Sequence, residues 1–310
     1  MSVTLSVVVP LYNEEEVIGE SYRRLKAVLD GLGETYELIF VNDGSRDSTW
    51  ALALALAEAD PNLRLLSFSR NFGHQTAITA GMDAAAGDAV VVIDADLQDP
   101  PEVIPQMLAK WREGYQVVYG LRTKRVGESV FKRLTAKVFY RTLNALTEVH
   151  LPVDAGDFRL LDRAVCDTLK RMPERNRYVR GLVSWVGFRQ TSVEFVRAER
   201  FAGVTKYPLS KMLRLAGDAL TSFSYKPLKL SILIGSLVSA ASFIYGIVII
   251  FQRLFTSVMV SGWATLACLT LFFNGLILIM MGIIGQYVGR IYDETKGRPL
   301  YIVAEKINFD

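Results

Sequence analysis

Short apolar runs alternate with amphipathic or alanine-rich segments along the first 120 residues of the chain. The apolar runs are Leu5–Leu11, Tyr36–Val41, Leu63–Phe68, Ala89–Ile93 and Gln116–Tyr119. The segments between them, at about 14–32, 48–59, 74–86 and 101–113, have the lengths of ordinary helices. Strands that alternate with such helices indicate βαβ units, so we predict an α/β fold with a mostly parallel sheet.

Polar residues follow three of the predicted strands. These residues are Asn13 and Glu14 after the first strand, Asp43 after the second, and Asp94 and Asp96 after the fourth. Because the carboxyl ends of parallel strands lie at one edge of a sheet, we expect these side chains to face a single crevice. Acidic groups there can hydrogen-bond the base and the ribose of a nucleotide. Each turn alone is explained equally well by a loop or a helix cap, and the convergence of three turns favours a binding site.

The stretch Val90–Pro101 carries the clearest chemical signal, because an apolar run leads directly into polar residues at alternate positions. Asp94, Asp96 and Gln98 supply two carboxylates and an amide. Hard oxygen donors of this kind suit Mg²⁺ or Mn²⁺. We expect such an ion to hold a diphosphate. The alternative is a strand end with solvated carboxylates, followed by an Asp-Pro turn.

A further carboxylate, Asp157, follows Gly156 and precedes the strand-like run Phe158–Leu161. Asp157 lies near the same crevice if this run joins the same sheet. We therefore include it among the candidate catalytic residues, together with the acidic pair of the fourth strand.

Composition narrows the possible functions. The net charge of +3 is too small to indicate nucleic acid as a partner. Two cysteines, far apart in the chain, suggest neither a disulfide framework nor a zinc site, and two histidines exclude a histidine-rich metal site. The N-terminus lacks a basic segment and a cleavage site, so we interpret it as a first core strand rather than a signal peptide. The hydrophobic fraction of 51% is high for a soluble protein, and the excess is local.

That excess lies in two uncharged apolar runs, Leu230–Phe251 and Ala264–Val288, each of about the length needed to cross a bilayer. Basic residues precede the first run and follow the second, and only Arg253 lies between them. The positive-inside rule then places both ends in the cytoplasm and the short loop outside. We expect a multi-pass protein of the inner (plasma) membrane with its catalytic domain at the cytoplasmic face. A nucleotide-type crevice beside a membrane indicates a water-soluble activated donor and a lipid-borne acceptor.

We divide the chain into four parts. These are a cytoplasmic catalytic domain at 1–208, an amphipathic juxtamembrane segment at 209–228, a transmembrane region at 229–289 and a cytoplasmic tail at 290–310. Small residues along the first span permit close helix packing, which is compatible with a homo-oligomer.

Two basic segments have the chemistry to bind phosphates. Residues 129–147 form a predicted amphipathic helix with Lys132 and Arg133 beside its apolar stripe, which indicates an anionic membrane surface or a phosphate-bearing partner. Residues 191–207 carry Arg200 and Lys206 around a glycine, and such a loop can close over a diphosphate. The simpler explanations are a surface helix packed on the core and an exposed basic loop.

Five motifs in this order resemble a known family. They are VVVPLYNEE, LIFVNDGSRDST, VVVIDADLQDPPEVIP, DAGDFRLLDR and RFAGVTKYP. Together they closely resemble the family-2 glycosyltransferases that make polyprenyl-phosphate sugars, a group with dolichol-phosphate mannose synthases and bactoprenol (undecaprenyl-phosphate) glucosyltransferases. The resemblance covers about residues 4–210, and the two terminal spans match the bactoprenol type better.

The resemblance implies a GT-A fold and metal-dependent, inverting transfer of a hexose from a nucleotide sugar to a polyprenyl phosphate. It assigns the Mg²⁺ or Mn²⁺ to Asp94, Asp96 and Gln98, and the nucleotide to Pro10, Tyr12, Asn13, Glu14, Asp43, Ser45 and Ala95. It assigns the donor diphosphate to Arg200 and Lys206, and the acceptor phosphate to Arg122, Lys132 and Arg133. Asp157 is expected to be essential, whether it orients the acceptor, contacts a sugar hydroxyl or acts as a base.

Several alternatives remain open at this point. UDP-glucose is the favoured donor because the two-span form resembles the bactoprenol glucosyltransferases, but GDP-mannose and a UDP-linked aminoarabinose derivative are also compatible. A processive polysaccharide synthase is disfavoured because the sequence lacks a Gln-x-x-Arg-Trp motif and further spans. A nucleotidyltransferase and a non-catalytic membrane scaffold that binds a nucleotide sugar are two further possibilities. The scaffold would recruit a flippase, which is also a possible partner of a glycosyltransferase at the membrane.

Overall fold

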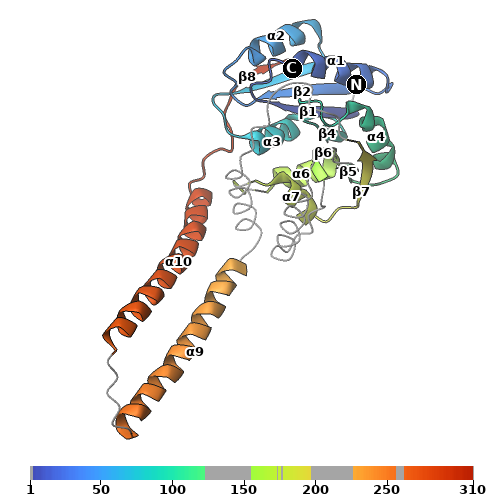
Figure 1. The fold of residues 1–310 in the computed structure, drawn as a ribbon. Helices are drawn as coiled ribbons and strands as arrows, with labels where there is room; N and C mark the ends of the chain where they lie inside the picture. The colour runs from blue at the N-terminus through green and yellow to red at the C-terminus, as the bar shows by residue number, and fades with distance from the viewer. Residues whose placement is uncertain are drawn as a thin grey trace. The chain divides into compact units, whose positions relative to one another are not determined.

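The computed structural model describes residues 3–122, 155–172, 174–175, 177–196, 226–255 and 262–309 (Figure 1). The predicted positions Lys132, Arg133, Arg200 and Lys206 lie outside these residues. The described residues separate into two compact units. One unit contains the sheet together with residues from Arg298 onward, and the other contains the two long apolar helices.

The first unit is built on an eight-stranded sheet, counted over the described residues, in the order β7-β5-β6-β4-β1-β2-β3-β8. The strands are β1 (Leu5–Leu11), β2 (Tyr36–Asn42), β3 (Leu63–Phe68), β4 (Ala89–Val92), β5 (Val117–Arg122), β6 (Ala155–Asp162), β7 (Gln190–Phe195) and β8 (Val303–Ile307). Strands β1 to β4 are mutually parallel, as are β5 and β7, whereas β6 and β8 are antiparallel to their neighbours. The predicted α/β fold with a mostly parallel sheet is therefore confirmed.

Helices cover both faces of this sheet. One face carries α1 (Ile18–Asp30), α2 (Thr49–Ala59) and α4 (Ile104–Arg112), the last preceded by the short 3₁₀ helix η1 (Pro101–Val103). The other carries α3 (His74–Ala84), α6 (Arg163–Lys170) and α7 (Val179–Trp185). Because β1 is covered on both sides, all seven of its residues are buried, which explains its almost unbroken apolar sequence.

Helix α3 lies unusually close to the centre of the sheet. A Cβ atom at Gly81 would collide with the side chain of Val8 on β1, so the glycine allows the helix backbone to approach the strand. This packing fixes the start of α3, and therefore His74, at the carboxyl edge of the sheet.

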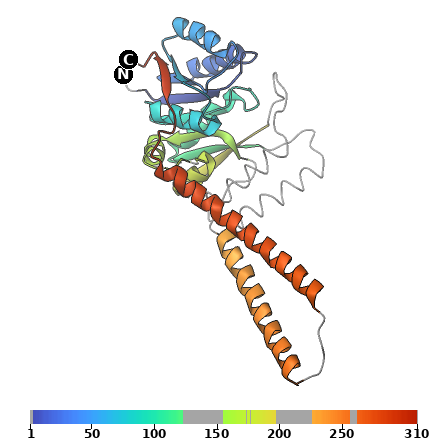
Figure 2. The ribbon, with the colours of Figure 1, turned by 90° about the vertical axis from the view of Figure 1, so that its left-hand side faces the viewer.

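Two strands differ from the sequence analysis. Residues 190–195, which we had placed partly in the basic loop, form β7. The predicted C-terminal tail contains β8, which pairs with β3 at the edge of the sheet (Figure 2). Asn308 extends this attachment, since its Nδ2 donates to the carbonyl oxygens of Ala57 and Leu63.

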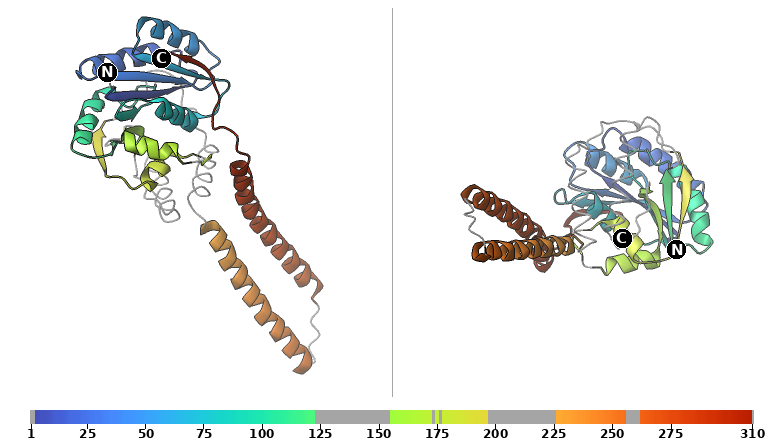
Figure 3. Two further views of the ribbon diagram at one scale, coloured as in Figure 1. Left: turned by 180° about the vertical axis from the view of Figure 1, so that it is seen from behind. Right: turned by 60° about the horizontal axis from the view of Figure 1, so that its bottom comes forward.

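The second unit is a pair of helices, α9 (Lys226–Phe255) and α10 (Trp263–Thr295) (Figure 3). Both are long and apolar enough to cross a membrane, with candidate spans at Ser231–Val248 and Phe272–Thr295. None of the residues in these two windows is buried. The helices contact each other near Gly235, where a Cβ would lie 3.9 Å from Met280 Cε.

Candidate active site

The loop after β4 presents the predicted metal ligands on one accessible side. Side chains alternate between partly exposed and buried along it. The partly exposed ones are Asp94, Asp96 and Gln98, and the buried ones are Ala95, Leu97 and Asp99. A positive φ of 59° at Leu97 and a hydrogen bond of 3.2 Å from Gln98 N to Asp96 Oδ1 hold this turn. The three predicted oxygen donors are therefore all accessible, while the residues between them are buried.

Asp94 has a carboxylate oxygen with unused bonding capacity. Its Oδ1 is buried and accepts no hydrogen bond from a described residue, although His74 Nε2 lies 3.5 Å away. Burial raises the pKa of Asp94 to about 6, against the lowering effect of His74 and with a further rise from neighbouring acids. A buried oxygen without a hydrogen-bond partner is costly unless a cation is bound there. The chemistry of this oxygen, together with the oxygen donors of Asp96 and Gln98, is of the kind that a divalent metal takes.

The donor set expected at this loop is two carboxylates and one amide. Across the described ranges, no group of three histidine, cysteine, aspartate or glutamate side chains is arranged to hold a metal ion. The assignment of Asp94, Asp96 and Gln98 to a metal therefore stays a prediction that rests on their donor chemistry, their partial exposure and the buried oxygen of Asp94.

Asp157 joins this site because β6 pairs with β4 in the same sheet. Its carboxylate accepts two hydrogen bonds from Arg180, at 2.8 and 2.9 Å, and one of 3.4 Å from Gln75 Nε2. Its Oδ2 also lies 3.2 Å from His74 Nε2. Burial would raise the pKa of Asp157, but Arg180 and His74 hold it well below its usual range. An ionised, hydrogen-bonded carboxylate is a weak proton acceptor, which favours an orienting role over a general base.

His74 links the two carboxylates. It is the first residue of α3, and Gly73 before it has a φ of 105°, a conformation that suits glycine. Burial would lower the pKa of His74, but its contacts with Asp157 and Asp94 raise it to about 9. The imidazole is therefore a cation at neutral pH, placed between an acid of β6 and an acid of the β4 loop.

Three residues that contact Asp157 were not among those predicted from the sequence: His74, Gln75 and Arg180. Gln75 also ties the site together, since its Oε1 accepts a hydrogen bond of 2.9 Å from the backbone N–H of Val179. This bond fixes the start of α7 and thereby Arg180. A histidine directly after Phe-Gly at the start of a predicted helix is the only signal in the sequence that pointed towards this cluster.

Asp43 is buried, and its carboxylate organises the loop that precedes His74. It accepts hydrogen bonds from Asn71 Nδ2 at 2.9 Å, Phe72 N at 2.6 Å and Gly73 N at 2.9 Å. These contacts show that Asp43 shapes the loop between β3 and α3. Its predicted contact with a nucleotide base stays a prediction.

The loops after β1 and β2 are joined by hydrogen bonds. Asn13 N donates to Ser45 Oγ at 3.0 Å, and Arg46 N donates to Asn13 Oδ1 at 2.9 Å. Glu14 N donates to Thr49 Oγ1 at 2.8 Å. Of the predicted nucleotide residues, Pro10 is buried in β1, and Tyr12, Asn13, Glu14 and Ser45 are exposed or partly exposed at this edge. The structure thus places them together at the expected end of the sheet.

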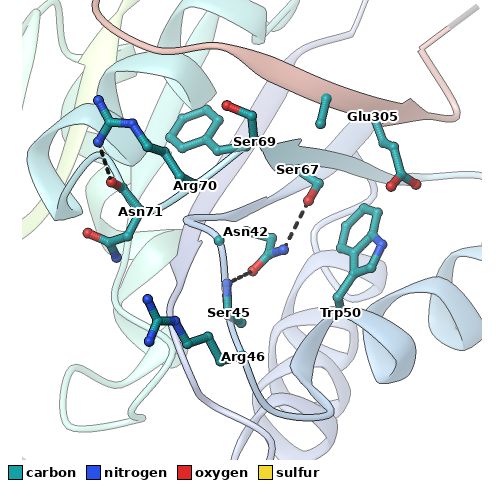
Figure 4. Close-up of a pocket in the computed structure, with 12 residues that line it drawn as sticks. Asn42, Ser45, Arg46, Trp50, Ser67, Ser69, Arg70, Asn71 and Glu305 are labelled. Atoms are coloured by element: carbon teal, nitrogen blue, oxygen red, sulfur yellow. Dashed lines mark hydrogen bonds between the residues drawn. The ribbon is translucent and has the colours of Figure 1, made fainter.

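A hollow of about 440 Å³ lies between the loops after β2 and β3, on the side of β8 (Figure 4). Its lining includes Arg46 from the loop after β2, Arg70 from the loop after β3, Trp50 from α2 and Glu305 from β8. Its base contains Asn42, which donates to Ser67 Oγ at 3.0 Å. This hollow adjoins the predicted nucleotide residues, but the carboxylates of the β4 loop do not line it.

Arg122, predicted to bind the acceptor phosphate, ends β5 and is partly buried. In the structure it is paired with Asp99 of the β4 loop, with 3.0 Å between Nη2 and Oδ2. The guanidinium predicted to bind the acceptor phosphate is therefore already held by Asp99 along one edge.

Asp94, Asp96 and Asp157 thus lie at the edge of a mostly parallel sheet where such folds bind their ligands. Residues 6–170 match the family model for glycosyl transferase family 2. The chain belongs to this family and is a glycosyltransferase with a GT-A-type sheet.

Relatives match nearly the whole chain. It is 56% identical over 305 residues to the uncharacterized glycosyltransferase YkcC of Bacillus subtilis, covering 98% of this chain and 94% of that one. It is 43% identical over 301 residues to the SfII prophage-derived bactoprenol glucosyl transferase of Shigella flexneri, with 97% of each chain covered. Among solved structures, it resembles glucosyl-3-phosphoglycerate synthase from Mycobacterium tuberculosis, in complex with Mn²⁺ and UDP-glucose, at 24% identity and a TM-score of 0.47 over 71% of this chain and 77% of that one.

Proposed function

We propose that the protein transfers glucose from UDP-glucose, with inversion, to undecaprenyl phosphate or a similar polyprenyl phosphate, and does so with Mg²⁺ or Mn²⁺. The observation that carries the proposal is the convergence of Asp94 and Asp157 on His74, in a chain that also has two exposed apolar helices. The full-length similarity to a bactoprenol glucosyl transferase supports the acceptor and the sugar.

In the proposed reaction, an oxygen of the acceptor phosphate attacks the anomeric carbon of the sugar, and the bond to the nucleotide diphosphate breaks. The acceptor is already an anion near neutral pH, so its oxygen needs no strong base. Asp157, whose pKa is held low, is a weak base, which agrees with a reaction that needs no strong one. The chemistry that remains is in-line placement of the two phosphates and neutralisation of the charge on the leaving diphosphate.

A divalent metal held by Asp94, Asp96 and Gln98 would supply part of that neutralisation as a Lewis acid. The remaining positive charge would come from Arg200 and Lys206, which the resemblance assigns to the diphosphate. Asp157 would hold Arg180 and His74 in position at the edge where the sugar is transferred.

The position of β8 supports a membrane topology with both chain ends on one side. Strand β8 pairs with β3 in the first unit, while α9 and α10 lie between β7 and β8 in the sequence. If both helices span the bilayer, the chain crosses twice and returns to the side of the sheet. Basic residues at Lys226, Arg290 and Arg298 then favour the cytoplasm as that side.

A membrane assay tests the reaction. Membranes that contain the protein are incubated with undecaprenyl phosphate and one of three labelled donors: UDP-glucose, GDP-mannose or a UDP-linked aminoarabinose derivative. We expect lipid-extractable label from UDP-glucose only, release of UDP rather than pyrophosphate, and loss of label with EDTA or with Asp96→Asn. Label from another donor would replace the sugar assignment, and absence of any transfer would refute the function.

Topology is tested with single cysteines and a membrane-impermeant maleimide in a background without the native cysteines. Ser257→Cys, between the two predicted spans, should react in intact cells. Glu305→Cys on exposed β8 should react only after the membrane is opened. Equal labelling of both positions in intact cells would contradict the proposed topology.

A further inference from the structure

Asp99, which directly follows the predicted metal ligands in the loop after β4, forms an ion pair with Arg122 at the end of β5. Arg122 Nη2 lies 3.0 Å from Asp99 Oδ2 and 3.2 Å from Oδ1, and Nε lies 3.3 Å from Oδ1. Asp99 is only 1% exposed, so this carboxylate faces the arginine rather than solvent. Because two nitrogens on one edge of the guanidinium share one carboxylate, the pair fixes the plane of the arginine side chain.

Gly156 provides the space for this pair. A Cβ atom at Gly156 would lie 2.5 Å from Arg122 Nη2 and 3.1 Å from its Cζ. Any larger residue would therefore push the guanidinium out of its place against β6. Gly156 also directly precedes Asp157, so the slot adjoins the catalytic carboxylate.

The remaining nitrogen of the guanidinium, Nη1, has no hydrogen-bond acceptor among the described residues, because Asp99 uses Nε and Nη2. The Arg122 side chain is 19% exposed. One edge of the arginine is thus held by the protein while the other can meet a ligand.

We propose that Asp99 is a positioning residue, which orients Arg122 so that Nη1 meets the phosphate of the lipid acceptor. This inference rests on the proposed function and on the assignment of Arg122 to the acceptor phosphate, which the family resemblance implies. Asp99 directly follows Gln98, so the same loop carries the donor metal set and holds the acceptor arginine. The link keeps the two phosphates at a fixed separation, which an in-line transfer needs.

A double-mutant cycle tests the link. Arg122→Ala should raise the KM for undecaprenyl phosphate about tenfold or more, the range of a lost hydrogen bond to a charged group. Asp99→Asn should raise the same KM by a similar factor and leave the KM for UDP-glucose within about twofold. The double variant should show no increase beyond Arg122→Ala, because Asp99 acts only through the arginine. Effects that multiply in the double variant would overturn the proposal.

Gly156→Ala provides a test that keeps both charges in place. The added methyl group should displace Arg122 and raise the acceptor KM without the same rise in the donor KM. Gly19→Ala is the matched control, because Gly19 is exposed on α1 and has no heavy atom within 4 Å of a Cβ placed there. An unchanged acceptor KM in Gly156→Ala, with a normal unfolding temperature, would overturn the assignment of the slot.

The experiments distinguish a failure of the proposed function from a failure of the proposed role of Asp99. If the wild-type protein transfers no sugar to undecaprenyl phosphate from any donor, the proposed function fails. If the wild-type protein is active and Asp99→Asn changes both KM values equally or neither, the role of Asp99 fails while the function stands. Thermal unfolding of each purified variant identifies one that has lost its fold, and Gly156→Ala then decides in place of Asp99→Asn.

Discussion

Arg180 hydrogen-bonds both carboxylate oxygens of Asp157, with Nε donating to Oδ1 at 2.8 Å and Nη2 donating to Oδ2 at 2.9 Å. This bidentate contact keeps Asp157 ionised and in one orientation. In the proposed reaction, Asp157 therefore orients its neighbours rather than moving a proton.

Replacement of Arg180 should therefore reduce turnover. Arg180→Lys keeps the charge but cannot hold both oxygens, and Arg180→Leu removes the charge as well. We expect kcat to fall by about tenfold to a hundredfold, the usual effect of misplacing a catalytic group, with the larger loss in Arg180→Leu. Steady-state kinetics with each substrate varied in turn measure the loss. Full turnover in both variants would show that Asp157 does not depend on this arginine.

The raised pKa of Asp94 predicts that this residue lowers the stability of the metal-free protein. Its pKa in the folded state is about 6, compared with an ordinary value of 3.8. Because the folded state holds the proton more tightly, stability is lost as the pH rises from about 3.8 to about 6. Above about pH 6 the full loss of stability is present. Asp94→Asn should therefore raise the free energy of unfolding at pH 7.5 by about 1–2 kcal/mol, a value discounted for partial exposure. The difference should vanish near pH 4, and thermal unfolding with EDTA at both pH values measures it.

Addition of a divalent metal should make the wild-type protein more stable than Asp94→Asn, which reverses the order expected without metal. An ion that binds only the folded state at about 100 times its Kd adds about 2.7 kcal/mol of stability. We expect Mn²⁺ to raise the unfolding temperature of the wild-type protein and to leave Asp94→Asn and Asp96→Asn nearly unchanged. An equal rise in all three proteins would place the Mn²⁺ elsewhere.

The sheet was predictable because its central strands are buried on both faces and therefore have almost unbroken apolar sequences. The bounds expected for β1 and β3 match those observed. Strand β8 escaped prediction because VAEKI lies at the sheet edge, where only Val303 and Ile307 are partly buried. Its mixed composition is typical of a solvated edge strand and gives no periodic signal.

The site was predictable only where its residues adjoin strand sequences. Asp94 and Asp96 follow a strand of the parallel set, whose carboxyl ends share one edge. Asp157 lies near the start of β6, which is antiparallel to β4, so the amino end of β6 reaches that same edge. Arg180 lies in a seven-residue helix, far from these residues in sequence, and no local pattern distinguishes it from a surface arginine. The partnership of Asp99 with Arg122 depends on the register of β5 against β6, which the sequence does not reveal.

Gly44 should not tolerate a side chain, because a Cβ there would collide with the backbone of the next loop. Gly33, which has a similar φ and no such neighbour, is the control. Gly44 and Gly33 have similar φ values, 66° and 69°. A Cβ at Gly44 would lie 2.5 Å from the carbonyl carbon of Arg70 and 2.6 Å from Asn71 N, whereas Gly33 has open space. Gly33→Ala should cost only about 1 kcal/mol of backbone strain. Gly44→Ala should cost more and, because it moves the loop that Asp43 holds, should also raise the KM for the nucleotide sugar.

Both alanine variants are compared by thermal unfolding and by donor kinetics. A rise in donor KM in Gly44→Ala alone would link the loop contact to nucleotide binding. Equal losses of stability, with donor KM unchanged in both, would show that the close approach to Arg70 has no functional consequence.

Tyr301 should anchor the C-terminal strand to the sheet domain. Its hydroxyl donates a hydrogen bond of 3.1 Å to Asp83 Oδ2 on α3, and its ring stacks on Phe68 with 5.3 Å between centroids. Tyr301→Phe keeps the stacking and should cost about 1 kcal/mol for the lost hydrogen bond. Tyr301→Ala removes both contacts and should cost about 2–3 kcal/mol, since the ring is only partly buried. Ile302→Ala is the control, because that side chain is 51% exposed and its backbone oxygen still accepts from Ser69 N.

Thermal unfolding of the full-length protein in detergent separates these variants, since 1 kcal/mol corresponds to about 2–4 °C for a domain of this size. We expect unfolding temperatures to fall in the order Ile302→Ala, Tyr301→Phe, Tyr301→Ala. Because Asp83 lies on the same helix as His74, Tyr301→Ala should also lower kcat, whereas Tyr301→Phe should not. A wild-type unfolding temperature in Tyr301→Ala would mean that β8 is held by its pairing with β3 alone.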